Sequence, residues 1–289
     1  MDSTKERIGL IERALQEALS LRPAYEKKLH QAMEYSLMAG GKRIRPLLLM
    51  AAADAVGGHG ENFITAACSL EMIHSYSLIH DDLPAMDDDD YRRGKPTNHK
   101  VFGEGMAILA GDGLETLAFE VLLRQKAAPE TLLAVVRELA DAAGPYGMVG
   151  GQAIDLDAED TSIDIKTLQK MHAGKTGALF RAAIRMGAIL AGAKEAELAA
   201  LTEYAEKFGM AFQITDDILD VTGDEALLGK PVGSDEKQHK STYVSLLSLH
   251  EAGELAKKAV DEAIAALEPF GERAAFLRQT VQYLLDRKA

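Results

Sequence analysis

Residues 64–90 read ITAACSLEMIHSYSLIHDDLPAMDDDD, and their pattern sets the expected fold class. On a helix of 3.6 residues per turn, the apolar side chains of residues 64–80 cover more than one face. Such a helix belongs inside a bundle, because an apolar surface that runs most of the way round needs partners on several sides. Six aspartates follow within ten residues, at positions 81, 82 and 87–90. We therefore expect a buried helix that ends in a concentrated negative charge.

The rest of the chain shows the same helical signature. Residues 104–124 and 164–192 are long and apolar on several faces, and they are rich in Ala and Leu, which are strong helix formers. The alternating pattern of β-strands is essentially absent. Clusters of Gly and Pro separate roughly ten helical segments. We predict an all-α protein with a single domain over residues 1–289, built as one large helical bundle.

Bulk composition excludes several classes of protein. The net charge of −13 argues against a nucleic-acid partner, which would need a basic face. The one cysteine, Cys68, cannot form an intrachain disulfide. The most apolar run, residues 46–53, is too short to span a bilayer, and the polar N-terminus lacks the apolar core of a signal peptide. We expect a cytoplasmic protein without a membrane span.

A second acidic cluster lies far downstream, in FQITDDILDV, residues 212–221. Asp216 and Asp220 are four residues apart and share a helix face, where like charges repel. The alternative interpretation, surface acids at a helix C-terminus, is unfavourable because the helix dipole prefers cations there. Mg²⁺ takes oxygen ligands and combines one or two carboxylates with substrate phosphates. We interpret the two acidic clusters as a Mg²⁺ site for a phosphorylated substrate.

The first cluster contains a helix breaker. Pro84 cannot continue the preceding helix smoothly, because its ring clashes with the carbonyl four residues earlier. On an ideal helix Asp81 and Asp87 would point in different directions, but a kink near residues 83–84 would bring Asp87 back beside Asp81. Asp81, Asp82 and Asp87 are therefore the candidate ligands here, with Asp216, Asp217 and Asp220 in the second cluster. Asp89 and Asp90 are expected to lie in a solvated loop.

Basic residues are placed to receive phosphate. In GGKRIRP, residues 40–46, Lys42 and Arg45 are three apart and share a helix face. Arg92 and Arg93 follow the first acidic cluster, and arginine offers a planar fork to phosphate oxygens. Any one basic pair, taken alone, is better explained as a surface salt bridge. Further candidates are His74, two helical turns before Asp81, together with Lys175, Thr176 and Lys230.

Residues 174–176, Gly-Lys-Thr, invite a phosphate-loop interpretation. The full pattern requires a glycine at position 169, where this chain has Gln169, and no strand precedes it. We therefore exclude a P-loop nucleotide hydrolase.

Five motifs together resemble one known family. GGKRIRP (40–46), the Asp-rich stretch with its Arg-Arg (81–93), GGQAIDL (150–156), GKTG (174–177) and FQITDDILD (212–220) stand in the order found in trans-isoprenyl diphosphate synthases. The chain is most similar to the bacterial branch that makes farnesyl diphosphate. The resemblance runs from about residue 25 to the C-terminus.

The resemblance implies an all-α homodimer with a deep central active-site cavity. Both aspartate sets would hold three Mg²⁺ ions, with Mn²⁺ as a possible substitute, on the diphosphate of an allylic substrate. Arg92, Lys175 and Lys230 would bind the same diphosphate. The diphosphate of isopentenyl diphosphate would be bound by Lys42, Arg45, His74 and Arg93.

The resemblance also implies the reaction, a head-to-tail condensation of isopentenyl diphosphate with dimethylallyl or geranyl diphosphate. The allylic C–O bond ionises, and oxygens of Thr176 and Gln213 stabilise the carbocation, with Lys175 on the leaving group. The proton is lost to the released pyrophosphate. Water must be excluded, and residues 230–240 and 287–288 are candidates for closing the site.

Chain length in this family depends on bulk just before the first Asp-rich motif. Tyr76, beside Ser77, stands five residues before Asp81, about 7.5 Å along a helix. An aromatic residue there resembles producers of the C15 product farnesyl diphosphate. The alternatives are a C10 or C20 product, a terpene cyclase, which would not need Lys42, Arg45 and His74, and a non-catalytic partner subunit.

Overall fold

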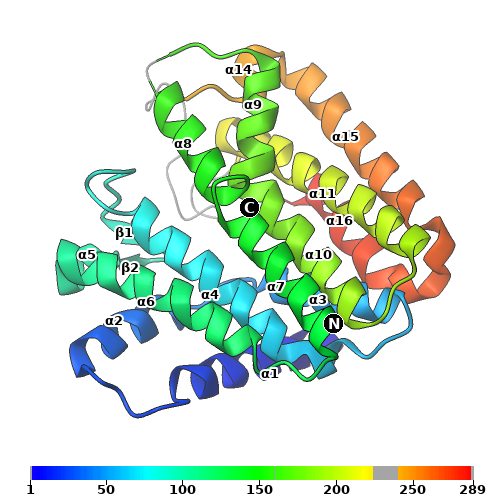
Figure 1. Ribbon diagram of the computed structural model, residues 1–289. Coiled ribbons are helices and arrows are strands. Elements are labelled where there is room, and N and C mark those ends of the chain that lie inside the picture. The colour runs from blue at the N-terminus through cyan, green and yellow to red at the C-terminus, as the bar shows by residue number, and fades with distance from the viewer. Residues whose placement is uncertain (1, 160, 224–239, 288–289) are drawn as a thin grey trace. The chain divides into compact units, whose positions relative to one another are not determined.

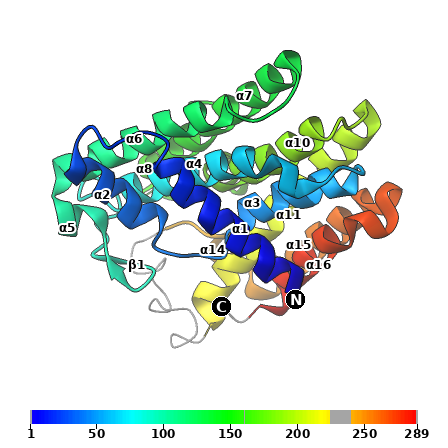
Figure 2. The ribbon, with the colours of Figure 1, turned by 90° about the horizontal axis from the view of Figure 1, so that it is seen from below.

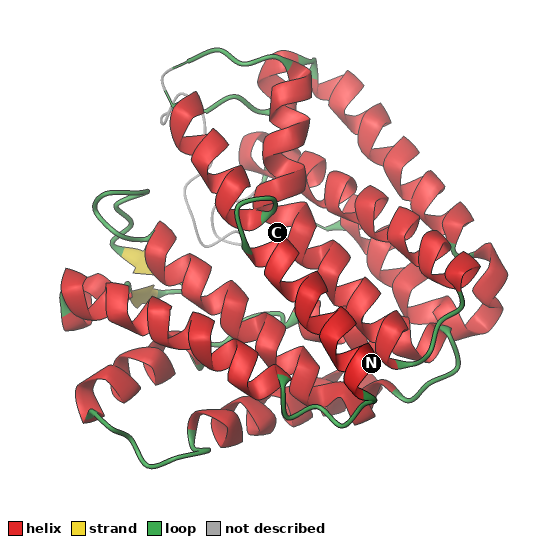
Figure 3. Cartoon of the chain, in the orientation of Figure 1, coloured by secondary structure: helices red, strands yellow, loops and turns green. Residues whose placement is uncertain are grey.

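The computed structural model describes residues 2–159, 161–223 and 240–287. The chain divides into two compact units. Unit 1 comprises Met1–Met50 and His59–Val136, and unit 2 comprises Ala51–Gly58 and Arg137–Ala289. A single domain over residues 1–289 stays a prediction. The all-α class is confirmed, because helices account for nearly all regular structure among the described residues (Figure 3).

Unit 1 is centred on α4, the helix predicted from residues 64–80. Helix α4 packs chiefly against α6, and also against α1 and α2 (Figure 1). All eight residues from Ala66 to Ile73 are buried, so the helix is enclosed on every side, as its sequence indicates. The elements are α1 (Asp2–Leu19), α2 (Lys27–Leu37), α3 (Ile44–Ala55, to Met50 in this unit), η1 (Gly60–Phe63), α4 (Ile64–Asp81), β1 (Tyr91–Arg92), β2 (Lys95–Pro96), α5 (Asn98–Phe102), α6 (Glu104–Leu122) and the start of α7 (Pro129–Ala143).

Unit 2 is built around the long helix α11. Helix α11 packs against α10 and α15, and α16 lies against both α11 and α15 (Figure 2). Its elements after α7 are α8 (Met148–Ala158), α9 (Ile165–His172), η2 (Ala173–Gly177), α10 (Ala178–Leu190), α11 (Glu195–Thr222), α14 (Tyr243–Leu246), α15 (Leu249–Ala266), η3 (Glu268–Ala274) and α16 (Ala275–Asp286).

Local signals place the helix boundaries. Gly103 separates α5 from α6 with φ of +89°, a conformation open to glycine and unfavourable for other residues. Helix α15 begins with a capping box, in which the Ser248 hydroxyl accepts from the amide of Glu251 and the Glu251 carboxylate accepts from the amide of Ser248. The helix expected over 164–192 is interrupted by η2, a π-helical turn that periodicity did not predict.

None of the helices in the described ranges has both the length and the apolar character to cross a bilayer.

Candidate functional site

Helix α4 ends at the first acidic stretch, and the backbone there turns back on itself. Asp82 caps the helix. The amide of Asp87 then donates to the carbonyl of Asp81 at 2.9 Å. The predicted return of Asp87 to the side of Asp81 is therefore confirmed for the backbone, at the point where Pro84 prevents the helix from continuing.

The carboxylate of Asp82 is buried and paired with Arg92. Its Oδ1 accepts from Arg92 Nε at 2.5 Å, and Arg92 Nη2 also lies 3.3 Å from Asp89. Burial raises the pKa of Asp82 to about 7, although Arg92 opposes this. An additional cation would therefore stabilise the ionised form. Of the two acids expected to be solvated, Asp89 is half-exposed and Asp90 is exposed, and both are paired, since Asp90 binds Lys100 at 2.6 Å.

Positive charge gathers around His74 on α4. Burial lowers the pKa of His74, and the guanidinium groups of Arg45, Arg93, Arg92 and Arg43 lower it further. Burial likewise lowers the pKa of Arg45 to about 10, with Arg93 adding repulsion. Each of these groups would gain from a nearby anion, because the opposite charge offsets both desolvation and mutual repulsion. Of the four residues predicted to bind one diphosphate, the structure brings Arg45, His74 and Arg93 together.

The fourth residue, Lys42, is exposed on the Gly40–Arg43 loop that precedes α3. This loop contacts Arg93 directly. Arg93 Nη1 donates to the carbonyl of Gly40, and a Cβ on Gly41 would lie 2.9 Å from Arg93 Cζ. Glycine is required at position 41, because φ there is +132° and the guanidinium occupies the space of a side chain.

The second acidic motif lies on α11 in unit 2, and its three carboxylates have different surroundings. Asp217 is buried and accepts the amide of Tyr243 at 2.7 Å, so it also holds the start of α14. Asp220 is buried as well. Asp216 is half-exposed, with its Oδ1 3.4 Å from Arg287 Nη2. Within this motif, Asp217 therefore makes a structural contact, and all three carboxylates lie along the same helix.

Both acidic stretches fit a hard cation that completes its shell elsewhere. Among the described residues, no three carboxylate, imidazole or thiol side chains gather closely enough to hold a metal ion by themselves. Mg²⁺ does not require such a cage, because it keeps several waters and binds through one or two carboxylates plus substrate phosphates. Buried carboxylate oxygens, such as those of Asp82 and Asp220, are suitable donors.

Lys175 and Thr176 lie on η2, the π-helical turn. Lys175 Nζ donates to Asp155 Oδ2 of α8 at 2.5 Å. The two elements meet at backbone distance, because a Cβ on Gly151 would lie 2.0 Å from the amide nitrogen of Lys175. π-Helical turns often occur at functional sites. Asp155 was not among the predicted site residues, although the GGQAIDL motif contains it, because its pairing with Lys175 depends on how α8 packs against η2.

Gln213 follows Phe212 on α11, beside an aromatic cluster. The ring of Phe212 lies 5.0 Å from that of Phe180 and 4.8 Å from the guanidinium of Arg287. Arg287 is therefore attached to α11 rather than extended away from it. Lys230, residues 230–239 of the predicted closing loop, and Lys288 lie outside the described residues.

Tyr76 is buried on α4, as a packed floor residue would be. Its ring meets that of His80 edge-on at 5.6 Å, and His80 packs against Gly111 of α6, where a Cβ would come within 2.1 Å of Nε2. Ser77 donates its hydroxyl to the carbonyl of His74 at 2.9 Å. Of the two chain-length candidates, only Tyr76 therefore has a bulky side chain that could block a growing product.

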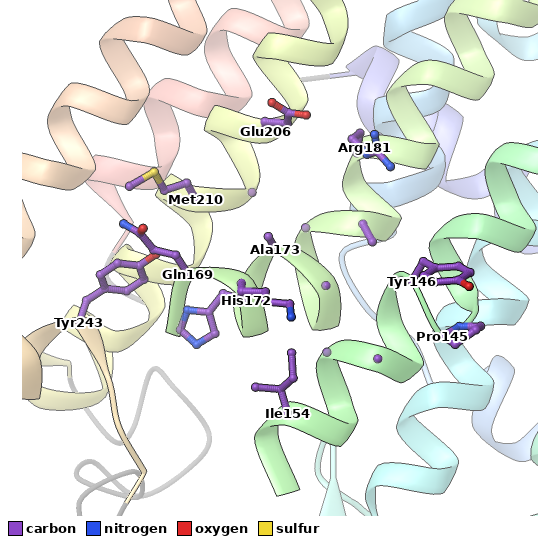
Figure 4. Close-up of a pocket in the computed structure, with 18 residues that line it drawn as sticks. Pro145, Tyr146, Ile154, Gln169, His172, Ala173, Arg181, Glu206, Met210 and Tyr243 are labelled. Carbon is purple, nitrogen blue, oxygen red and sulfur yellow. The ribbon is translucent and has the colours of Figure 1, made fainter. Parts of the chain in front are cut away.

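Unit 2 also holds a cavity of about 830 Å³, which none of the predicted site residues lines. Its lining includes Gly174 and Gly177 of η2. Figure 4 shows His172 and Tyr243 close together at one end, and Glu206 and Arg181 at another. The ring centroids of His172 and Tyr243 are 5.5 Å apart. Much of the wall is formed by glycines of α8, η2 and α11 and by the residue that precedes α8: Gly150, Gly151, Gly174, Gly177, Gly209 and Gly147.

Comparison with known proteins covers nearly the whole chain. Residues 26–282 match the family model described as polyprenyl synthetase. A farnesyl diphosphate synthase of Geobacillus stearothermophilus is 52% identical over 230 residues, which are 78% of this chain and 77% of that protein. One from Escherichia coli (strain K12) is 44% identical over 95% of this chain and 94% of its own. The crystal structure of geranylgeranyl pyrophosphate synthetase from Pyrococcus horikoshii superposes with a TM-score of 0.92 at 34% identity, covering 99% of this chain and 98% of that one.

Proposed function

This chain belongs to the polyprenyl synthetase family, and we propose that it makes farnesyl diphosphate. The reaction joins isopentenyl diphosphate head-to-tail to dimethylallyl and then geranyl diphosphate, with release of pyrophosphate. Relatives at 44% and 52% identity that carry the name farnesyl diphosphate synthase support this product. The structural observation that carries the proposal is the cluster of arginines around His74 in unit 1.

That cluster suits the isopentenyl substrate. Arg45, Arg93 and His74 are desolvated cations or neutral donors with lowered pKa values, and Lys42 lies on the adjoining loop. A diphosphate brings enough negative charge to relieve the repulsion among the arginines, and the planar guanidinium groups match its oxygens. We assign these four residues to isopentenyl diphosphate.

The allylic diphosphate is assigned to the acidic motifs and the remaining cations. Asp81, Asp82, Asp87, Asp216, Asp217 and Asp220 would hold three Mg²⁺ ions, with Arg92, Lys175 and Lys230 on the same diphosphate. Bound Mg²⁺ supplies Lewis-acid neutralisation of the charge that develops on the leaving group. Arg92 and Lys175 already stand beside carboxylates, at 2.5 Å from Asp82 and Asp155, so their charged ends are oriented before substrate arrives.

Thr176 and Gln213 are assigned to the carbocation. Their oxygens carry partial negative charge, which stabilises a developing cation without capturing it. The proton lost in the final step passes to pyrophosphate. Exclusion of water protects the cation from quenching, and the anchored Arg287 is proposed to help retain this dry environment.

Product length is assigned to Tyr76. Its ring is buried, so it presents a fixed obstacle to a growing chain. A side chain packed in this way resists displacement, because moving it would open a void in the core.

A homodimer is proposed from the family. The exposed apolar residues Ile108 and Leu109 of α6, and Leu133 of α7, support it, since exposed apolar side chains gain from burial against a partner. A cytoplasmic location is part of the same proposal.

A product assay tests this function. The purified protein is incubated with isopentenyl and dimethylallyl diphosphates and Mg²⁺, and the alcohols released by phosphatase are resolved by length. A dominant C15 alcohol is expected. A C10 or C20 alcohol would preserve the reaction and overturn the assigned length. No product from folded protein would instead indicate a partner subunit.

A further inference from the structure

We infer that Arg43 is a positioning residue, which fixes the Gly40–Arg43 loop so that Lys42, Arg45 and Arg93 are arranged for the isopentenyl diphosphate. The inference rests on the proposed function of those three residues. Arg43 itself has no role in that proposal, and its side chain is fully buried.

The guanidinium of Arg43 bonds to three separate elements of unit 1. Nε donates to Glu12 Oε1 of α1 at 2.7 Å, and Nη1 donates to Glu71 Oε1 of α4 at 2.6 Å. Nη2 donates to the carbonyl of Leu37, at the end of α2, at 2.9 Å. Only arginine presents donors on three sides of one rigid plane, so the loop is held against three helices at once.

The backbone of this loop requires such support. Arg43 has φ of +48°, in the left-handed region that disfavours residues with a side chain. Gly40 and Gly41, at +92° and +132°, precede it. A loop in this conformation would relax without its anchors, and strain of this kind persists only where the surroundings impose it.

Displacement of the loop would move several proposed phosphate ligands together. Lys42 is the neighbour of Arg43, and Arg45 lies one residue into α3. Arg93 is attached to the other end of the loop, because it donates to the carbonyl of Gly40 and covers Gly41. Arg93 also adopts a left-handed φ of +53°. The loop and the β1–β2 hairpin therefore form one support for the isopentenyl site.

Glu71 adds an electrostatic part to this support. It is buried, and its charge raises the pKa of Arg43, Arg45 and Arg93 against the lowering caused by burial. It thereby offsets part of the repulsion among three arginines that lie close together. The Arg43–Glu71 ion pair lies at the loop that carries the proposed diphosphate ligand Lys42. An ion pair needed only for packing could lie elsewhere in unit 1.

The experiment compares Arg43→Lys with the wild-type protein in steady-state kinetics. Lysine keeps the charge but loses two of the three directed bonds. The KM for isopentenyl diphosphate is expected to rise by about tenfold, with kcat and the KM for geranyl diphosphate changed by less than about twofold. Arg7→Lys is the matched control, because Arg7 is another ion-paired arginine of unit 1, with its Nε 3.3 Å from Glu61 of η1. It should leave all three constants unchanged.

Glu12→Ala provides a second, gentler variant in case Arg43→Lys fails to fold. Glu12 is partly exposed, so its removal takes away one anchor and leaves the bond to Glu71. A smaller rise in the same KM is expected. Equal changes in both KM values, or a lower melting temperature with unaltered kinetics, would overturn the positioning role.

The same measurements separate this inference from the site it rests on. Arg45→Ala tests the ligand assignment directly. If Arg45→Ala leaves the KM for isopentenyl diphosphate unchanged, the proposed site is wrong. If Arg45→Ala raises it and Arg43→Lys does not, the site stands and the role of Arg43 is rejected.

Discussion

Arg287 Nη2 lies 3.4 Å from Asp216 Oδ1 and donates to the carbonyl of Phe212 at 3.1 Å. Its guanidinium also stands 4.8 Å from the centroid of the Phe212 ring. The end of the described chain is thus attached to the helix that carries the second acidic motif. Burial lowers the pKa of Arg287, while Asp216 opposes that change. Three contacts to one short segment show that Arg287 is held against α11 at the second acidic motif.

Truncation after Leu285 is predicted to lower turnover. Removing Arg287 takes away the contacts to Phe212 and Asp216, and under the proposed closing role this loss would admit water to the carbocation. We expect kcat to fall by about tenfold with little change in melting temperature. Arg287→Lys is the matched control, because lysine keeps the positive charge but lacks the planar guanidinium that stacks on Phe212. Its kcat should lie between those of the wild-type and truncated proteins. Unchanged kinetics in the truncated protein would remove Arg287 from any closing role.

Tyr76→Ala is predicted to lengthen the product. Loss of the ring leaves space below the growing chain, so C20 or longer alcohols should appear beside C15. The substitution also empties a core position and should destabilise the protein by about 3 kcal/mol. Tyr76→Phe retains the bulk and should keep the C15 product. A Tyr76→Ala enzyme that is active and still stops at C15 would show that the floor lies elsewhere.

Mg²⁺ alone is predicted to stabilise the protein only slightly. No three ligating side chains gather by themselves among the described residues, so the ion needs phosphate oxygens to complete its shell. Mg²⁺ with inorganic pyrophosphate should therefore raise the melting temperature clearly more than either component alone. Asp216→Asn should reduce that combined shift. A large shift with Mg²⁺ alone would contradict the incomplete-shell interpretation.

Chelation with EDTA should abolish turnover, and added Mg²⁺ should restore it.

His172→Gln is predicted to reduce the acid sensitivity of folding. Burial lowers the pKa of His172 to about 4, against about 6.5 in an unfolded chain. The unfolded state then binds more protons between these values, so the contribution of His172 to stability is complete above about pH 6.5 and is lost as the pH falls toward 4. Between pH 7.5 and pH 5 the free energy of unfolding of the wild type should fall by about 2 kcal/mol more than that of the variant.

Urea unfolding at those two pH values measures this difference. His250→Gln is the control, because His250 is exposed at the start of α15. Equal losses in wild type and His172→Gln would show that other groups cause the acid sensitivity.

The sequence by itself determined the helices and the chemistry they carry. Apolar periodicity located α4 and α6 within a few residues, since that pattern is a property of each helix alone. The break at Pro84, and with it the return of Asp87 to Asp81, also followed from local chain geometry. The order of the five motifs indicates the family from the sequence alone.

Only the tertiary structure decided how charges are paired. Arg43 meets Glu71 across 28 residues and Glu12 across 31, and Lys175 meets Asp155 across 20. No periodicity encodes such contacts, because they depend on how separate helices pack and not on the residues between them. The π-helical turn at Lys175 has the same origin, since a one-residue shift in helical register leaves the composition of the segment unchanged.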